Sequence, residues 1–257
     1  MSDFVPIPER QKQILSMLSR QGRLSVAQIV SRFSISEATA RRDLGLLASQ
    51  GKAQRVHGGA IAIEQAPPEL PILERTSEQA DEKARIGRIA ADLIAEKETV
   101  FIGSGTTTLE VARNLRGRKN LTVITNSLGV LNMLAGNKEI AVVSLGGMLR
   151  DSELSFIGHI TEQALAEVRA DKVIMGARGL SLEHGLTNDY LQETLTDRAI
   201  LKTGPEVIIV ADHTKVNRVA TALLAPLKSI HRLITDSRAD KKFIQAVRKQ
   251  GIEVVVA

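Results

Sequence analysis

The chain has 257 residues, 43% of them hydrophobic and 25% charged, a composition typical of a soluble protein with one large domain or two smaller ones. No run of about 18 apolar residues predicts a membrane span, and the first residues, MSDFVPIPERQ, lack the pattern of a secretion signal, so we expect a cytoplasmic protein that does not bind membranes. The absence of cysteine excludes disulfides and thiol chemistry, and the five histidines show no ligand spacing, so we expect neither a metal nor a cofactor.

The net charge of +5 is concentrated at one end of the chain. Residues 1–60 hold nine Lys and Arg against four Asp and Glu, whereas residues 61–257 hold 25 of each sign. A basic surface confined to one segment is typical of a region that binds a polyanion. The charge distribution therefore favours a nucleic acid as the partner of the first segment.

Three short helices and a hairpin are predicted in residues 1–63. Residues 9–20 carry apolar side chains at helical spacing, a capping-box pattern at Ser25 begins a second helix, and Ser36 caps a third. Residues 52–63, KAQRVHGGAIAI, alternate around a basic, glycine-containing turn as a small hairpin does. This order of elements predicts a winged helix-turn-helix domain that binds double-stranded DNA.

The third helix, SISEATARRDL and beyond, separates into an apolar and a polar face. At 100° per residue, Ala40, Leu44 and Leu47 share one side and Arg42 lies opposite them, beside small residues that let the helix approach a groove. Arginine reads guanine edges in the major groove, and hydroxyls near a helix start bind phosphates. The predicted DNA contacts are Ser25, Ser36, Glu37, Ala38, Thr39, Arg41, Arg42, Lys52, Arg55 and His57.

A plainer interpretation of the same helix is that Arg41, Arg42 and Asp43 form a solvated charged face with local salt bridges. Such a triplet alone is more often this than a DNA-binding surface. The charge asymmetry, the helix spacing and the basic wing together favour DNA. His57 on its own fits an exposed polar residue better than one that reads bases.

Residues 64–78 contain three prolines and no periodicity, and they are predicted to form a linker to a second domain in residues 79–257. Beyond this point, nearly continuous apolar runs alternate with helical segments, as in a doubly wound, mostly parallel α/β domain. The predicted strands lie in TVFIG, LTVIT, IAVVSL, DKVIMG, EVIIVAD, HRLITD and IEVVVA.

The first of these strands leads into a loop of glycines and threonines that precedes a helix. Glycines let the backbone approach a ligand, and the amides at a helix start bind anions such as phosphate. Alternatively, Gly103 and Gly105 serve only a tight turn. The loops after the other strands favour a site, because strand ends converge on one crevice in such a sheet. The loop candidates are Ser104, Gly105, Thr106, Thr107, Thr125, Asn126, Ser127, Gly146, Gly147, Asp212 and Lys215.

A dinucleotide is not expected in this crevice. The loop lacks the G-x-G-x-x-G spacing, and the next strand ends in Thr125 and Asn126 where an acid that binds ribose would stand. We therefore expect a phosphorylated ligand other than a dinucleotide.

The run SISEATARRDLGLLASQGKAQRVHGGA resembles the signature of the DeoR/GlpR family of bacterial transcriptional regulators. Further family-like runs, SGTTT, VITNS, LGGMLR, GLT and DHTK, extend the resemblance over nearly the whole chain. The resemblance implies a second domain similar to ribose-5-phosphate isomerases that senses a phosphorylated sugar. It assigns effector binding to Arg75 and Lys83, and to Asp212 and Lys215. Lys215 would neutralise the phosphate or hold a sugar hydroxyl, and Asp212 would accept hydrogen bonds from hydroxyls; the plainer alternative for these two residues is an ordinary surface ion pair.

Two positions depart from the family pattern. Ile102 stands where the family usually has aspartate, and Arg178 stands where it usually has a polar or acidic residue. Loss of a carboxylate and gain of a guanidinium lead us to expect a more anionic effector, such as a sugar acid phosphate or a bisphosphate.

Two functions follow from these patterns. The first is a repressor of a carbohydrate-metabolism operon that a phosphorylated sugar or sugar acid releases from DNA, acting as a dimer or tetramer because one winged helix reads few base pairs. The alternative is a sugar-phosphate isomerase with an appended DNA-binding domain, in which Asp212, Asp189 or Glu193 would be the base. Ile102 occupies one of the obvious acidic positions, so we expect a regulator and not an enzyme.

Overall fold

The computed structural model describes residues 6–21, 23–49, 53–56, 58–62, 64–65 and 70–257. The chain divides into two compact units, Met1–Gln65 and Ala66–Ala257. Among the described residues, none of the helices is both long and apolar enough to cross a membrane.

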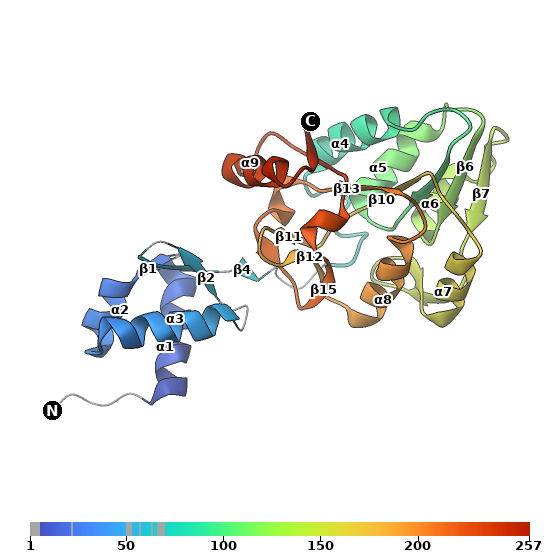
Figure 1. The fold of residues 1–257 in the computed structure, drawn as a ribbon. Coiled ribbons are helices and arrows are strands. Elements are labelled where there is room, and N and C mark those ends of the chain that lie inside the picture. The colour runs from blue at the N-terminus through green and yellow to red at the C-terminus, as the bar shows by residue number, and fades with distance from the viewer. Residues whose placement is uncertain (1–5, 22, 50–52, 57, 63, 66–69) are drawn as a thin grey trace. The chain divides into compact units, whose positions relative to one another are not determined.

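The first unit contains three helices and a small antiparallel sheet (Figure 1). The helices pack around a core that includes Ile14, Ile29 and Leu44. The hairpin is the predicted wing, and a third strand, formed by the residues before the second helix, pairs with it. The elements are α1 (Ile7–Gln21), β1 (Arg23–Ser25), α2 (Val26–Phe33), α3 (Glu37–Ser49), β2 (Ala53–Val56) and β3 (Gly59–Ala62), followed by the short β4 (Glu64–Gln65).

Side chains cap the two helices of the helix-turn-helix as predicted. Ser25 Oγ accepts a hydrogen bond from the Gln28 amide at 3.2 Å, and Gln28 Oε1 accepts one from the Ser25 amide at 2.7 Å. At the start of α3, Ser36 Oγ accepts a hydrogen bond from the Thr39 amide at 3.1 Å. These bonds satisfy amides that have no partner within the helix, and they fix where both helices begin.

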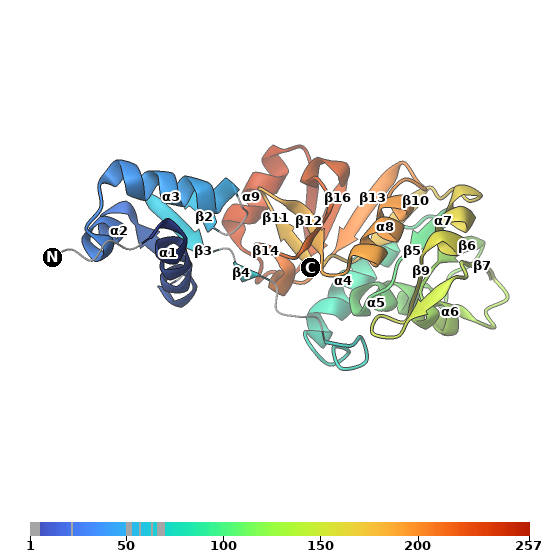
Figure 2. The same ribbon diagram turned by 90° about the horizontal axis from the view of Figure 1, so that it is seen from below.

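The second unit is built on a sheet of seven parallel strands in the order β17-β16-β13-β10-β5-β6-β7 (Figure 2). All seven apolar runs singled out in the sequence form these strands. Their bounds are β5 (Thr99–Ile102), β6 (Leu121–Thr125), β7 (Ile140–Ser144), β10 (Lys172–Met175), β13 (Glu206–Val210), β16 (Arg232–Thr235) and β17 (Glu253–Val256).

Helices cover both faces of this sheet. Because successive side chains of a strand point to opposite faces, Val100 and Ile102 pack in one apolar cluster and Phe101 packs in the other. The first cluster includes residues of α4 (Ala80–Asp92), α5 (Thr106–Leu115) and α6 (Leu128–Leu134). The second includes residues of α7 (His159–Ala166), α8 (Leu191–Ile200) and α9 (Lys241–Lys249). Burial on both faces explains the lack of polar alternation in the strands.

Short antiparallel strands, which the sequence pattern did not predict, lie beside the main sheet. They are two to four residues long, too short for a period of two to stand out. They comprise the hairpin β8 (Met148–Arg150) and β9 (Ser155–Ile157) and the three-stranded sheet β11 (Gly179–Ser181), β12 (Gly185–Asn188) and β15 (Ala222–Ala225). A further short strand is β14 (Arg218–Val219). Two 3-10 turns, η1 (His213–Lys215) and η2 (Leu227–Ser229), complete the unit.

Residues 70–78, part of the expected linker, pack against the second unit. The Ile72 side chain is buried, and the Ile72 amide donates to the Ser152 carbonyl at 2.7 Å. Arg75 is buried as well and forms an ion pair with Glu153. This stretch therefore belongs to the second unit and contributes side chains to its interior.

Candidate DNA-binding surface and effector pocket

The polar face of α3 is exposed as the periodicity predicted. Ala38 and Arg42 are exposed, whereas Ala40, Leu44 and Leu47 are buried in the core. Arg42 thus projects from the helix that reads DNA in this motif.

The neighbouring Arg41 takes part in contacts that stiffen the same surface. Its guanidinium pairs with Glu37 one turn earlier at 3.2 Å. Its carbonyl accepts a hydrogen bond from Arg55 Nη1 at 2.9 Å, which links the wing strand β2 to α3. Contact of Arg41, Glu37 and Arg55 with DNA stays a prediction.

Asp43 is buried, unlike the two exposed arginines that precede it. Its carboxylate is buried and lies 2.7 Å from Arg10 Nε on α1, with both side chains about 5% exposed or less. Gln11 Nε2 donates to the other carboxylate oxygen at 3.3 Å. The interpretation of all three residues as a solvated charged face is therefore wrong for Asp43, which holds α1 and α3 together.

The hydroxyls of Ser25, Ser36 and Thr39 are engaged at the helix starts. Ser36 Oγ also lies 2.9 Å from Thr39 Oγ1. A hydroxyl oxygen that accepts an amide bond in a cap keeps its proton to donate, although one of the Ser36 and Thr39 protons is used between these two side chains. The prediction that these residues contact DNA stays a prediction. Lys52 and His57, the other two wing candidates, lie outside the described residues.

A pocket of about 600 Å³ opens at the carboxyl ends of β5, β10 and β13. From β5 the chain continues through β6 and β7 toward one edge of the sheet, whereas β10, β13, β16 and β17 extend toward the other. The pocket thus lies where the strand order reverses, the usual place for a ligand in such sheets. Its volume is within the range of small-molecule sites, roughly 300 to 1,000 Å³.

The structure brings most of the predicted effector residues to this pocket and leaves the others outside its lining. The residues that line it are Arg75, Lys83, Ser104, Gly105, Thr106, Thr107, Arg178, Asp212 and Lys215. Those outside the lining are Thr125, Asn126, Ser127, Gly146 and Gly147.

The residues outside the lining support the loops after β6 and β7. Thr125 Oγ1 donates to a carbonyl of β5 at 2.6 Å and accepts from the Ser127 amide, while Ser127 Oγ caps α6. Gly146 accepts a hydrogen bond from Thr161, and a Cβ on Gly147 would lie 2.2 Å from Thr161 Oγ1. These contacts give the polar and glycine residues a structural role in the loops after β6 and β7.

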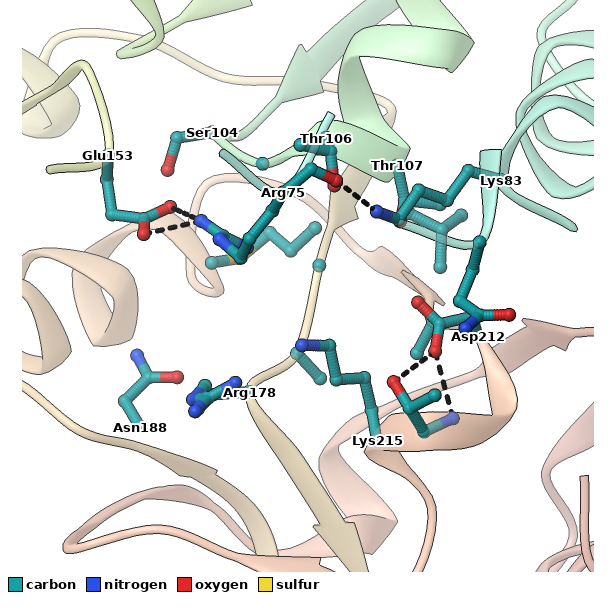
Figure 3. Close-up of a pocket in the computed structure, with 18 of the residues that line it drawn as sticks. Arg75, Lys83, Ser104, Thr106, Thr107, Glu153, Arg178, Asn188, Asp212 and Lys215 are labelled. Atoms are coloured by element: carbon teal, nitrogen blue, oxygen red, sulfur yellow. Dashed lines mark hydrogen bonds and ion pairs between the residues drawn. The ribbon is translucent and has the colours of Figure 1, made fainter. Parts of the chain in front are cut away.

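The loop after β5 presents the start of α5 to the pocket. Gly105 has a φ of 131°, a value that favours glycine, and no described side chain caps the helix that follows. Ser104, Thr106 and Thr107 add hydroxyls beside the amides of the first turn (Figure 3). Helix-start amides and hydroxyls together suit the oxygens of a phosphate.

Lys83 lies beside this loop, within the pocket wall. Its ammonium donates to the Arg75 carbonyl at 2.8 Å, and its side chain is buried. Burial lowers the pKa of Lys83; the Asp212 carboxylate opposes this shift, and the charges of Lys215 and Arg75 add to it. An anion bound here would offset the repulsion among these cations.

Asp212 and Lys215 occupy the turn after β13. The Asp212 carboxylate accepts hydrogen bonds from the amide of Thr214, at 2.9 Å, and from its hydroxyl. Figure 3 shows Lys83, Asp212 and Lys215 on one side of the pocket. The turn thereby holds Lys215 in the wall of the pocket.

Arg178, one of the two departures from the family pattern, forms an ion pair with Asp189. The carboxylate offsets the positive charge that the guanidinium adds to the pocket. The expectation of a more anionic effector, which rests on Ile102 as well as on Arg178, stays a prediction.

Among the lining residues that the sequence analysis did not propose as effector contacts, Glu153, Asn188, Glu193 and Asp197 form one polar cluster. Glu193 was considered only as a possible base. Glu193 Oε1 accepts from Ser155 Oγ at 2.9 Å, and Asn188 Nδ2 donates to Asp197 at 2.7 Å. They come from β12, α8 and the β8–β9 turn, and nothing in their spacing along the chain marks them as one cluster.

Arg150 connects this cluster to an aromatic ring. Its guanidinium pairs with Glu193 and lies 4.6 Å from the centre of the Tyr190 ring. Stacking of this kind holds a guanidinium in place while its hydrogen-bond donors contact a carboxylate.

Asp197 has the most perturbed environment of the cluster. Burial and then the negative charge of Glu193 raise its pKa well above the ordinary value of 3.8, although the hydrogen bond from Asn188 acts in the opposite direction. A carboxyl group with a raised pKa in the folded state stabilises the fold least once the pH exceeds that pKa.

Replacement of Asp197 by asparagine should therefore stabilise the protein increasingly as the pH rises. Below the ordinary pKa the two forms should have similar melting temperatures, because Asp197 is neutral whether the chain is folded or unfolded. At alkaline pH the variant should melt at a higher temperature than the wild type, as followed by circular dichroism. Asp151→Asn, which changes an exposed carboxylate, is the matched control. A difference that does not vary with pH would contradict the raised pKa.

Comparison with known proteins agrees with both halves of this architecture. The model of the DeoR-like helix-turn-helix domain matches residues 10–66, and that of the DeoR C-terminal sensor domain matches residues 78–237. The transcriptional repressor AccR of Agrobacterium fabrum is 34% identical over 91% of each chain. The regulator IolR of Bacillus subtilis is 32% identical over 98% of each. The glycerol-3-phosphate regulon repressor of Escherichia coli is 32% identical over 96% of this chain and 97% of its own.

Solved structures give a weaker match. Ribose 5-phosphate isomerase A of Methanocaldococcus jannaschii is 19% identical, with a TM-score of 0.40, over 54% of this chain and 55% of that one. Likeness at this level carries no information about function.

A winged helix-turn-helix followed by an α/β domain with a polar pocket defines a transcriptional regulator with a sensor domain. Both family models and the named relatives agree on the family to which the chain belongs. The chain belongs to the DeoR family of transcriptional regulators.

Proposed function

We propose that this protein represses a carbohydrate-metabolism operon and that a phosphorylated sugar, bound in the pocket of the second unit, releases it from its operator. The observation that carries the proposal is the start of α5, which lines the pocket together with Lys83 and Lys215. Amides, hydroxyls and ammonium groups in one place suit a phosphate ester.

The DNA-binding part of the proposal is supported by the exposed face of α3. Arg42 and Ala38 lie on the exposed side of the helix, and the wing contacts its backbone through Arg55. One such domain reads few base pairs, and so we propose that the protein binds repeated or palindromic half-sites as a homodimer or tetramer.

Release requires that the effector bind the DNA-free state more tightly than the DNA-bound state. A gel-shift titration on DNA from upstream of the protein's own gene, repeated with a panel of sugar phosphates, tests this. One phosphate ester should release the DNA at micromolar concentration. Tighter DNA binding in its presence would keep the pocket and reverse the proposed direction of regulation. Specific DNA binding that no panel member alters would contradict the effector assignment.

Lys215→Met should weaken the response to that ester without weakening DNA binding. Loss of a charge-assisted hydrogen bond to phosphate costs roughly 1.5 to 3 kcal/mol, so the concentration for half release should rise about 10- to 150-fold. Lys228→Met, at an exposed lysine outside the pocket lining, is the matched control. An unchanged response in Lys215→Met would remove Lys215 from the site.

The isomerase alternative is less favoured. Two of the acids considered as bases form ion pairs, Asp189 with Arg178 and Glu193 with Arg150, and Asp212 holds the turn at Thr214. The curated relatives named above are regulators or repressors. Incubation with pentose and hexose phosphates should yield no isomer.

A further inference from the structure

We propose that the end of the pocket formed by Glu153, Glu193 and Asp197 receives the hydroxyl groups of the effector, and that the effector carries one phosphate and an otherwise uncharged polyhydroxyl body. This inference rests on the proposed function and narrows it to one chemical class of ligand.

The pocket has two ends of different chemistry. Figure 3 shows Lys83 toward one side, Glu153, Asn188 and Arg178 toward the opposite side, and the Lys215 ammonium between them. Glu193 and Asp197 line the same cavity, and Asp197 is bonded to Asn188. A ligand whose phosphate contacts the start of α5 would extend its other end toward these carboxyl groups.

Three arginines near the carboxyl end have carboxylate partners, and one of them, Arg178, pairs with Asp189. Arg75 Nη2 contacts both oxygens of Glu153, at 2.5 and 2.6 Å, in a pair that is about 8% exposed. Arg150 pairs with Glu193 and stacks on Tyr190. The charge of each guanidinium is thus already offset by a carboxylate, which weakens its attraction for a second anion.

The hydrogen-bonding groups at this end match hydroxyls. Carboxylate oxygens accept hydrogen bonds, and each sugar hydroxyl has a proton to donate. Asn188 offers both an amide and a carbonyl, and the environment of Asp197 favours its neutral form, which can donate as well as accept. A row of hydroxyls can therefore be bonded without a net charge on the ligand at this end.

A carboxylate or second phosphate at the same end would face these acids instead. Two carboxylates side by side repel each other, and a buried charge without a partner is strongly disfavoured. The inference is thus opposite to the expectation of a sugar acid phosphate or bisphosphate that arose from Ile102 and Arg178.

Calorimetry on the full-length protein can test this with matched pairs of ligands. The panel holds triose to hexose monophosphates, each beside its sugar acid or bisphosphate; glucose 6-phosphate beside 6-phosphogluconate and fructose 6-phosphate beside fructose 1,6-bisphosphate are two such pairs. For every pair in which binding occurs, the member whose only charged group is one phosphate should bind at least tenfold more tightly.

Variants test whether the difference in affinity between the two members of a pair arises at the carboxyl cluster. Glu193→Gln should narrow the gap between the two members of a pair several-fold, whereas Glu183→Gln, at an exposed site outside the pocket lining, should leave it unchanged. If Glu193→Gln fails to fold, the wild-type panel alone still decides the question.

Equal or tighter binding of the sugar acid phosphate or bisphosphate would overturn this inference and leave the proposed function in place. An unaltered gap in a folded Glu193→Gln would remove that residue from the proposed contacts and overturn the inference as stated. If no phosphate ester binds, the proposed function and this inference are both overturned. This outcome is recognised because neither member of any pair gives a calorimetric signal.

Discussion

Replacing Asp43 with alanine is expected to lower the free energy of unfolding of the first unit by about 3 to 5 kcal/mol, because the buried Arg10 would lose the carboxylate that offsets its charge. The pair joins α1 to α3 through a contact of 2.7 Å that is nearly closed to solvent. DNA binding should then fail because the helix that carries Arg42 is no longer held in place.

Hydrogen exchange read by peptide mass provides the measurement, since it reports the stability of each segment separately. Peptides from α1 and α3 should lose protection in Asp43→Ala, and peptides from β5 and α5 should not. Glu37→Ala removes one member of an exposed pair on the same helix and is expected to change stability by no more than about 0.5 kcal/mol. Equal losses in the two variants would show that the buried pair has no special role.

Replacing Arg42 with alanine should weaken binding to the cognate operator by roughly 1 to 3 kcal/mol while binding to random DNA changes little. Arg42 is exposed on α3 in the position from which this motif contacts base edges. The comparison of the two DNA sequences distinguishes a contact to a base from a contact to a phosphate.

Arg42→Lys is the informative companion variant. Lysine keeps the positive charge and loses the planar fork that contacts guanine with two hydrogen bonds. It should retain binding to random DNA and lose most of the preference for the operator, as measured by fluorescence anisotropy at fixed salt. Equal losses on both DNAs in Arg42→Ala, with full rescue by lysine, would identify Arg42 as a phosphate contact.

The seven strands of the large sheet were predictable because both faces of it are buried. Their residues are almost continuously apolar and stand out from the surrounding sequence. The exposed face of α3 was predictable for a related reason, since one regular helix fixes which residues share a side. Asp43 was not, because its partner Arg10 lies on another helix and the local sequence carries no sign of it.

The pocket was only partly predictable, because strand order is not encoded in any single strand. The glycine and threonine loop after β5 and the turn at Asp212 have recognisable sequence patterns and do line the pocket. The loops after β6 and β7 look equally suitable in the sequence, but the sheet order places them on the side of β5 away from β10 and β13. The carboxyl end could not be found, since Glu153, Asn188 and Asp197 come together only in the folded unit.

The stack of Arg150 on Tyr190 gives the protein a built-in optical probe. Tyr190 is the sole tyrosine of a chain that has no tryptophan, so ultraviolet-excited emission near 300 nm originates almost entirely from one ring. That ring contacts the guanidinium that pairs with Glu193 in the pocket wall. A change in the pocket can therefore be followed in the native protein without attaching a dye.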